Sequence, residues 1–151
     1  MCQICFHLIF ILPVNLKFFR YLLDMNLQEQ ISRILEMMEV SDLNILNEPL
    51  KVCSRNPMTG YFRDGYCKTD ESDSGTHTVC AKVDKEFLKF TKFMGNDLST
   101  PTKSFPGLKS GDRWCLCAKR WEEANQNGVA PKVIKNATNK KTFDIIGDVI
   151  N

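Results

Sequence analysis

Apolar and polar positions alternate with a helical period in four parts of the chain. Over residues 26–39, apolar side chains recur every three or four positions and would share one face, which predicts an amphipathic helix. A second helix is expected from the capping residue Asp84 to about Met94, with Gly95 as its terminator. Shorter helices are expected over residues 118–127 and 140–146.

Other segments show the pattern of extended structure. Residues 76–83 alternate and contain β-branched side chains, which predicts a strand, and residues 114–117 and 131–137 are expected to be extended as well. Residues 44–52 predict a short strand or an extended entry into the domain, and Tyr61-Phe62-Arg63 resembles one arm of a hairpin. Short strands separated by helices predict an α+β fold, with a small mixed sheet and three to four helices.

One long polar loop interrupts this order at residues 96–111. It contains two prolines and two glycines among several hydroxyl side chains. Ordered loops of this length are uncommon unless they have a function. The loop is therefore a candidate part of a functional site.

The hydrophobic pattern also suggests how the chain is organised. Residues 1–24 form an apolar leader whose longest apolar run is too short to cross a bilayer as a helix. Its positive charges follow the run, whereas a secretory signal places them before it. We expect the leader to be dispensable, residues 25–43 to form the amphipathic helix and a linker, and residues 44–151 to form one α+β domain. No membrane partner is expected unless the leader is an anchor.

Composition narrows the class of protein. The 151 residues carry a net charge of +2, and 43% of them are hydrophobic, as in an ordinary globular domain. The charge is too small and too dispersed for a nucleic-acid interface. Seven cysteines are spread over the chain, which favours reduced thiols or a metal site over a disulfide scaffold and predicts a cytoplasmic location.

Several motifs occur together in order along the domain. They are Asn47-Glu48-Pro49-Leu50, Gly60-Tyr61-Phe62-Arg63-Asp64-Gly65, Thr76-His77-Thr78-Val79-Cys80-Ala81, Gly95 to Pro101 and Phe105 to Ala118. Over roughly residues 44 to 149 the chain resembles an uncharacterised, mostly bacterial family, domain of unknown function 2237. Many members have a cysteine where Tyr66 stands and a histidine where Asn139 stands. The resemblance implies a cytoplasmic single-domain protein and supplies no activity.

A first hypothesis for the site is a metal centre. One histidine and three cysteines are a ligand set that zinc accepts, and the candidates are His77, Cys80, Cys115 and Cys117. On a straight strand His77 and Cys80 point to opposite faces, so a bulge or a helical turn would be needed to bring them together. The alternative is that these cysteines are small buried apolar residues.

A second hypothesis is a cysteine-dependent enzyme. Cys115 is the candidate nucleophile and His77 the candidate base, with Asp112 or Asp64 to orient the imidazole. A nearby arginine, Arg113 or Arg120, would favour the thiolate. The alternative for these cysteines is an inert place in the core.

A third hypothesis is a binding site for a small polar or anionic ligand. Arginine forks, loop hydroxyls and an indole wall would supply the contacts, from Arg63, Asp64, Asn96, Asp97, Ser99, Thr100, Arg113 and Trp114. These loop side chains could instead cap backbone groups in tight turns. Taken together, we expect a small-ligand- or metal-binding domain with its polar centre at His77, Asn96–Thr100 and Asp112–Cys117. A cysteine-dependent enzyme is the alternative, and a protein–protein adaptor is the third possibility.

Overall fold

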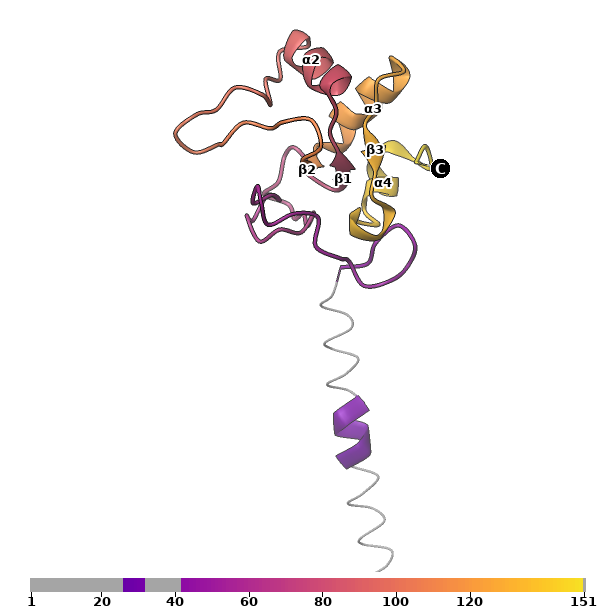
Figure 1. The fold of residues 1–151 in the computed structure, drawn as a ribbon. Coiled ribbons are helices and arrows are strands. Elements are labelled where there is room, and N and C mark those ends of the chain that lie inside the picture. The colour runs from indigo at the N-terminus through magenta and orange to yellow at the C-terminus, as the bar shows by residue number, and fades with distance from the viewer. Residues whose placement is uncertain (1–25, 32–41, 151) are drawn as a thin grey trace, which may run out of the picture. The chain divides into compact units, whose positions relative to one another are not determined.

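The computed structural model describes residues 26–31 and 42–150 (Figure 1). The chain divides into two compact units, Met1–Val40 and Ser41–Asn151. In the first unit, residues 26–31 are helical and exposed. The rest of the helix predicted over 26–39, and the leader predicted over 1–24, lie outside the described residues. None of the helices in the described ranges is long and apolar enough to cross a bilayer.

The second unit is built on a small antiparallel sheet. Its strands are β1 (Val79–Lys82), β2 (Arg113–Leu116) and β3 (Lys132–Val133), in the order β2-β1-β3. The end of β1 and the start of β2 lie side by side, because the Val83 N–H donates to the Asp112 carbonyl at 2.9 Å. A strand that starts where its neighbour ends must run antiparallel to it. The α+β class is confirmed, but the sheet is not mixed as predicted, because both of its strand pairings are antiparallel.

The helices follow the predicted segments closely. They are α2 (Lys85–Phe93), α3 (Ala118–Gln126), the 3₁₀ helix η1 (Lys135–Ala137) and α4 (Thr142–Ile146). Asp84 caps α2 by accepting a hydrogen bond from the Phe87 N–H at 2.8 Å. The strand predicted over 131–137 is shorter than expected, because β3 has two residues and the chain then coils into η1.

Two predicted extended segments take another form. Residues 61–63 lie in a turn rather than in a hairpin arm, and Arg63 has a positive φ of 55°. Near residues 44–52, only isolated bridges occur, such as the one between Asn44 and Asn139. Their backbone groups bond partly within turns, as from the Asn44 N–H to the Glu48 carbonyl, and partly to the segment after β3, as from the Lys51 N–H to the Asn136 carbonyl.

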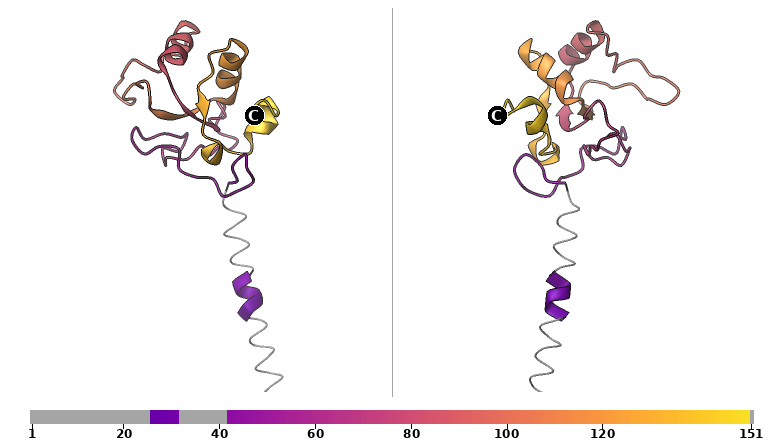
Figure 2. Two further views of the ribbon diagram at one scale, coloured as in Figure 1. Left: turned by 45° about the vertical axis from the view of Figure 1, so that its right-hand side comes forward. Right: turned by 180° about the vertical axis from the view of Figure 1, so that it is seen from behind.

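The two faces of the sheet differ in what covers them. Side chains alternate along a strand, and Val79, Ala81 and Trp114 belong to a hydrocarbon core with Phe87 of α2 and Trp121 of α3. Figure 2 shows α2 and α3 above the sheet in both views. The intervening strand residues, Cys80 and Cys115, belong to a separate buried cluster. That cluster packs under the loops of residues 51–76.

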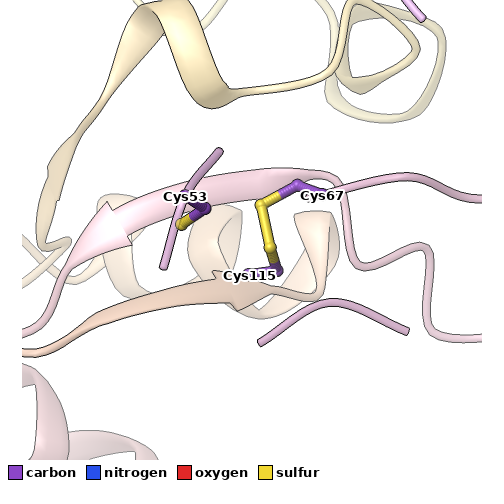
Figure 3. A group of neighbouring side chains, drawn as sticks. All are labelled: Cys53, Cys67 and Cys115. Atoms are coloured by element: carbon purple, nitrogen blue, oxygen red, sulfur yellow. A yellow bond between two sulfur atoms is a disulfide. The ribbon is translucent and has the colours of Figure 1, made fainter. Parts of the chain in front are cut away.

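Disulfide bonds secure this second face. Cys53 is bonded to Cys80. Cys67 is bonded to Cys115, and Figure 3 shows this second bond with Cys53 beside it. The expectation that the cysteines are reduced is therefore wrong for these four residues. Although Cys80 and Cys115 stand opposite each other in the sheet, each is bonded to a loop cysteine. Both loop partners come from the irregular segment 51–76, whose path in space cannot be derived from hydrophobic periodicity.

Candidate active site

The register of β1 and β2 brings His77 and Cys117 together. Val79 pairs with Leu116, so the antiparallel register, continued past the strand ends, places the residues before β1 beside those after β2. A hydrogen bond from the Ala118 N–H to the Thr76 carbonyl, 3.1 Å long, supports this approach. As a result, the Cys117 Sγ lies 3.2 Å from the His77 Nε2. Within the described residues, Cys117 is the free cysteine, and it is half-buried.

A buried carboxylate holds the other side of the imidazole. The His77 Nδ1 donates to the Asp73 Oδ1 at 2.7 Å. The second carboxylate oxygen of Asp73 accepts the His77 backbone N–H at 2.7 Å and the Thr69 hydroxyl at 3.0 Å. The Asp73 side chain has no exposed surface, whereas the His77 side chain is 32% exposed. These bonds fix both the position of the ring and the nitrogen that faces Cys117.

The same contacts favour a protonated His77. Its hydrogen bond to Cys117, followed by the contacts with Asp73, raises the pKa of His77 to about 9, although desolvation acts in the opposite direction. At neutral pH both ring nitrogens therefore carry protons, one donated to sulfur and one to carboxylate. Burial tends to raise the pKa of Asp73, but its hydrogen bonds from His77 and Thr69 outweigh burial and lower it. An imidazolium beside a sulfur stabilises the thiolate.

Cys117 also stands at the start of a helix. It is the N-cap residue of α3, and no side-chain hydrogen bond caps that helix. The first N–H groups of a helix have no intrahelical acceptors and carry a partial positive charge. The sulfur therefore lies next to the positive end of the α3 dipole.

The sulfur opens into a hollow of about 370 Å³. Residues from the loop before β1 and from the first two turns of α3 line it: Ser74, Gly75, Thr76, Cys117, Lys119, Arg120 and Glu123. A small molecule in this hollow could therefore reach the sulfur. The described geometry thus combines a half-exposed thiol, a fixed imidazole and space for a reactant.

Gly75 allows the imidazole and the thiol to approach each other. A Cβ atom at this position would lie 2.6 Å from the His77 Cε1 and 3.2 Å from the Cys117 Sγ. The first distance is shorter than a van der Waals contact permits, so a side chain here would displace the ring or the sulfur. The absence of a Cβ is therefore a requirement of this geometry.

The residues predicted to bind metal separate into two groups. His77 and Cys117 are in contact, whereas Cys80 and Cys115 are each bonded to another cysteine and offer no thiolate. Three sulfurs, those of Cys53, Cys67 and Cys115, lie within 4.8 Å of one another, and two of them form one disulfide. The sulfur cluster is thus a pair of neighbouring disulfides.

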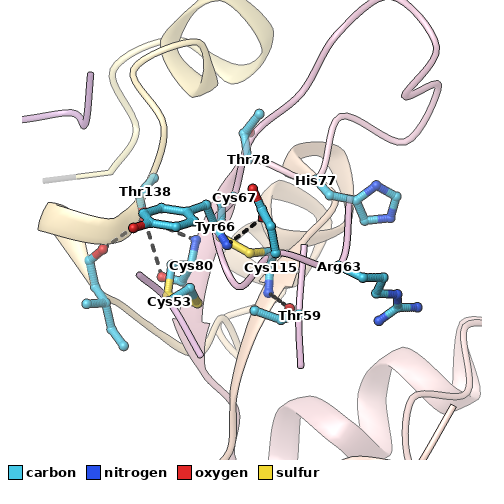
Figure 4. The surroundings of a disulfide bond; sticks show 12 residues. Cys53, Thr59, Arg63, Tyr66, Cys67, His77, Thr78, Cys80, Cys115 and Thr138 are labelled. Atoms are coloured by element: carbon cyan, nitrogen blue, oxygen red, sulfur yellow. Dashed lines mark hydrogen bonds between the residues drawn. A yellow bond between two sulfur atoms is a disulfide. The ribbon is translucent and has the colours of Figure 1, made fainter. Parts of the chain in front are cut away.

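Hydroxyl groups bind the backbone around these disulfides. The Cys80 N–H donates to the Thr138 hydroxyl at 3.1 Å, and the Cys115 N–H donates to the Thr59 hydroxyl at 2.8 Å (Figure 4). Cys115 was the predicted nucleophile. Its side chain is buried and bonded to Cys67, so the free thiol next to His77 belongs to Cys117, two residues further on.

The predicted orienting carboxylates have other partners. Asp112 accepts the Lys109 N–H at 2.8 Å, and Asp64 accepts the Tyr66 N–H at 3.0 Å. Asp73, which the sequence interpretation missed, occupies the place beside His77. The one available signal was an acidic residue four positions before the histidine, and outside a helix that spacing carries no geometric meaning.

The predicted ligand-binding residues also separate. The Arg63 guanidinium lies 5.1 Å from the centre of the Trp114 ring, and both residues line a hollow with His77. The loop after α2 is stabilised by its own contacts, because Asp97 accepts hydrogen bonds from the backbone N–H groups of Ser99 and Thr100. Among the described residues, no hydrogen bond or ion pair joins that loop to His77 or Cys117. Asn96 likewise bonds back to α2, and Arg113 is exposed at the start of β2.

Comparison with known proteins places the chain in a family. No curated protein matches it. A family described as uncharacterised proteins conserved in bacteria matches residues 43–149, which is well over half of the chain. The chain therefore belongs to the family of domain of unknown function 2237 (DUF2237).

Proposed function

We propose that this protein is a cysteine-dependent enzyme that acts on an activated acyl group. Cys117 is the nucleophile, His77 the general acid and base, and Asp73 the residue that orients His77. The observation that carries this proposal is the continuous line of contacts from the Cys117 Sγ through His77 to Asp73, at 3.2 Å and 2.7 Å. A nucleophile, a base and a group that orients the base are the recurring parts of such sites.

The reaction would proceed in two balanced steps. The Cys117 thiolate attacks the carbonyl carbon of an ester or thioester, and His77 gives its Nε2 proton to the leaving alcohol or thiol. The product is released and a thioester on Cys117 remains. Neutral His77 then removes a proton from water, which attacks the thioester carbonyl and regenerates the thiolate and the imidazolium. Asp73 stays ionised throughout and keeps the Nδ1–H in place.

The start of α3 would stabilise the charge that develops during attack. A tetrahedral intermediate carries a negative oxygen, which backbone N–H groups stabilise when they are already oriented. The Ala118 N–H already donates to the Thr76 carbonyl, so the N–H groups of Lys119 and Arg120 in the first turn of α3 would fill this role. They require no reorganisation during the reaction, because the helix already holds them.

The small-ligand interpretation becomes part of this proposal, since an enzyme needs a place for its substrate. The hollow of about 370 Å³ at Cys117 supplies that place. The zinc interpretation has less support, because two of its four ligands are in disulfides.

The location in the cell stays a prediction. The expected cytoplasmic location depended on reduced cysteines, and structural disulfides are rare where thiols are kept reduced. Alkylating thiols in intact cells before lysis would decide between compartments. Unmodified Cys53 and Cys67 would indicate an oxidising compartment, and modified ones would indicate the cytoplasm.

The experiment is acylation of the full chain with p-nitrophenyl acetate, in a Cys2→Ser/Cys5→Ser background that leaves Cys117 as the free thiol. We expect release of nitrophenolate and an acetylated Cys117, identified by peptide mass mapping. Cys117→Ala abolishes acylation, and His77→Gln slows it by about a hundredfold or more. Asp73→Asn is expected to slow it as well, because the ring loses its fixed orientation. Equal acylation of Cys117→Ala and its parent would contradict the proposal.

A further inference from the structure

A second hollow adjoins the imidazole. It has a volume of about 260 Å³, and its lining residues are Gly60, Tyr61, Arg63, His77, Trp114 and Cys115. His77 lies in its wall and touches Cys117 with its Nε2. A molecule bound here would therefore lie next to the reacting pair.

The hollow contains a cation without an acidic partner. The exposed Arg63 guanidinium lies over the Trp114 ring, and its Nη1 donates to the Met58 carbonyl at a long 3.3 Å. Among the residues that the structure describes, no carboxylate forms an ion pair with Arg63. Most of its five N–H groups thus remain available to a ligand. Figure 4 shows Arg63 and His77 projecting toward the same side of the molecule.

The loop that carries Arg63 is fixed to the catalytic segment. The Arg63 N–H donates to the Gly60 carbonyl at 3.1 Å. The Tyr61 hydroxyl donates to the Ser72 carbonyl at 3.1 Å, and the Tyr61 ring stacks on His77 with 6.2 Å between centroids. Since Ser72 immediately precedes Asp73, the cation, the aromatic wall and the orienting carboxylate are held as one unit.

A guanidinium fork pairs best with a planar, doubly accepting anion such as a carboxylate. The aromatic walls, Tyr61 and Trp114, suit a short aliphatic chain between that anion and the reacting carbonyl. We propose that the Arg63 hollow recognises the distal carboxylate of the acyl group, so that the substrates are esters or thioesters of short dicarboxylic acids. This inference rests on the function proposed for Cys117, and the reaction follows the two steps given above.

The test compares two esters that differ in one charge: mono-p-nitrophenyl glutarate and its methyl ester. We expect the full-length protein to be acylated by the charged ester about tenfold faster, after correction for the rates with a free thiol. Arg63→Gln should bring the ratio of the two rates close to one, and because the ratio is taken within one variant, any general effect on Cys117 cancels. Arg55→Gln is the matched control, because Arg55 is an exposed arginine of a neighbouring turn outside the hollow, and it should keep the preference.

The possible failures are distinguishable. If both esters acylate Cys117 equally in the parent protein, or if Arg120→Gln rather than Arg63→Gln removes the preference, the inference about the Arg63 hollow is overturned while the nucleophile stands. If no ester acylates Cys117, the function proposed above fails. In that case, binding of glutarate itself, followed by the NMR shift of the Trp114 indole N–H, decides whether the carboxylate site exists. A saturable shift that Arg63→Gln abolishes supports the carboxylate site, and no shift refutes it.

Discussion

On one face of the sheet, Val79 and Ala81 pack with Phe87 and Trp121 in a hydrocarbon core, whereas on the other face Cys80 and Cys115 are bonded to loop cysteines. The first face is stabilised by the burial of apolar area, at about 25 cal/mol for each Å². The loops over the second face, residues 51–76, contain no helix and no strand beyond an isolated bridge. On this second face, disulfide bonds stabilise the fold, as apolar packing does on the face covered by α2 and α3.

This difference bears on the candidate site. Asp73, Gly75 and Arg63 all belong to the cross-linked loops, and His77 follows directly after them. Only Cys117 comes from the helical side, at the start of α3. The site therefore forms at the boundary between a well-packed half and a half held by disulfides. We therefore expect the geometry of the site to depend mainly on the half that is held by disulfides.

Reduction of both disulfides is the strongest way to test this comparison. The bonds close segments with sequence separations of 27 and 48, and each is expected to contribute about 3 to 5 kcal/mol to the free energy of unfolding. We expect reduction to expose the backbone amides of residues 51–76 before those of α2 and α3. Hydrogen exchange measured by mass spectrometry would show the order.

Phe87→Ala is the matched change on the other face. This substitution should lower the free energy of unfolding by a similar amount, about 3 to 5 kcal/mol, because it leaves a cavity beneath α2. In the fraction of Phe87→Ala protein that stays folded, however, Cys117 should be alkylated at the parent's rate and in preference to the other cysteines. The reduced protein should lose this preference. If both changes affected the alkylation of Cys117 equally, the two faces would not act separately.

Gly75→Ala is expected to have a smaller effect that is confined to the site. The new Cβ must displace His77 or Cys117, so the Cys117–His77 hydrogen bond should lengthen. Alkylation of Cys117 by iodoacetamide should slow by about tenfold or more, with little change in melting temperature. Ser74→Ala, at the exposed neighbouring position, is the control and should leave the rate unchanged. A Gly75→Ala protein with the parent's rate would refute the importance of this close approach.

The last effect concerns pH. The pKa of His77 is about 9 in the folded protein and about 6.5 for an unperturbed histidine. The protonated ring therefore adds stability that is fully present below about pH 6.5 and is lost as the pH rises through about 9. The difference in unfolding free energy between the parent and His77→Gln should narrow over this range. A difference that stays constant with pH would mean that folding does not raise the pKa of His77.

Part of this structure could be predicted from the sequence. The helix capped by Asp84 and the helix ended by Gly128 are local features, since caps and apolar period specify them within a few residues. The contact between His77 and Cys117 is not local. It depends on the pairing of Val79 with Leu116, and a shift of one residue in that register would have placed Cys117 on the other face.

The irregular segments were the least predictable. To choose between Cys115 and Cys117 as the nucleophile, one must know which of them is bonded to Cys67. Cys67 lies in a segment without a hydrophobic period, so its partner could not be predicted from the sequence. The role of Asp73 depends on a tight turn in which Thr76 has a positive φ of 46°. Short polar residues permit many turns, and the sequence does not single out this one.

The pattern of cross-links also determines what a protease would release. The backbone between Cys53 and Cys67 has an exposed tip at Tyr61 and Phe62. Cleavage there would separate two peptides in sequence, yet the first would remain tied to the second through the bond from Cys53 to Cys80. The nicked molecule would stay one covalent body, and its two fragments would part only after a reductant is added.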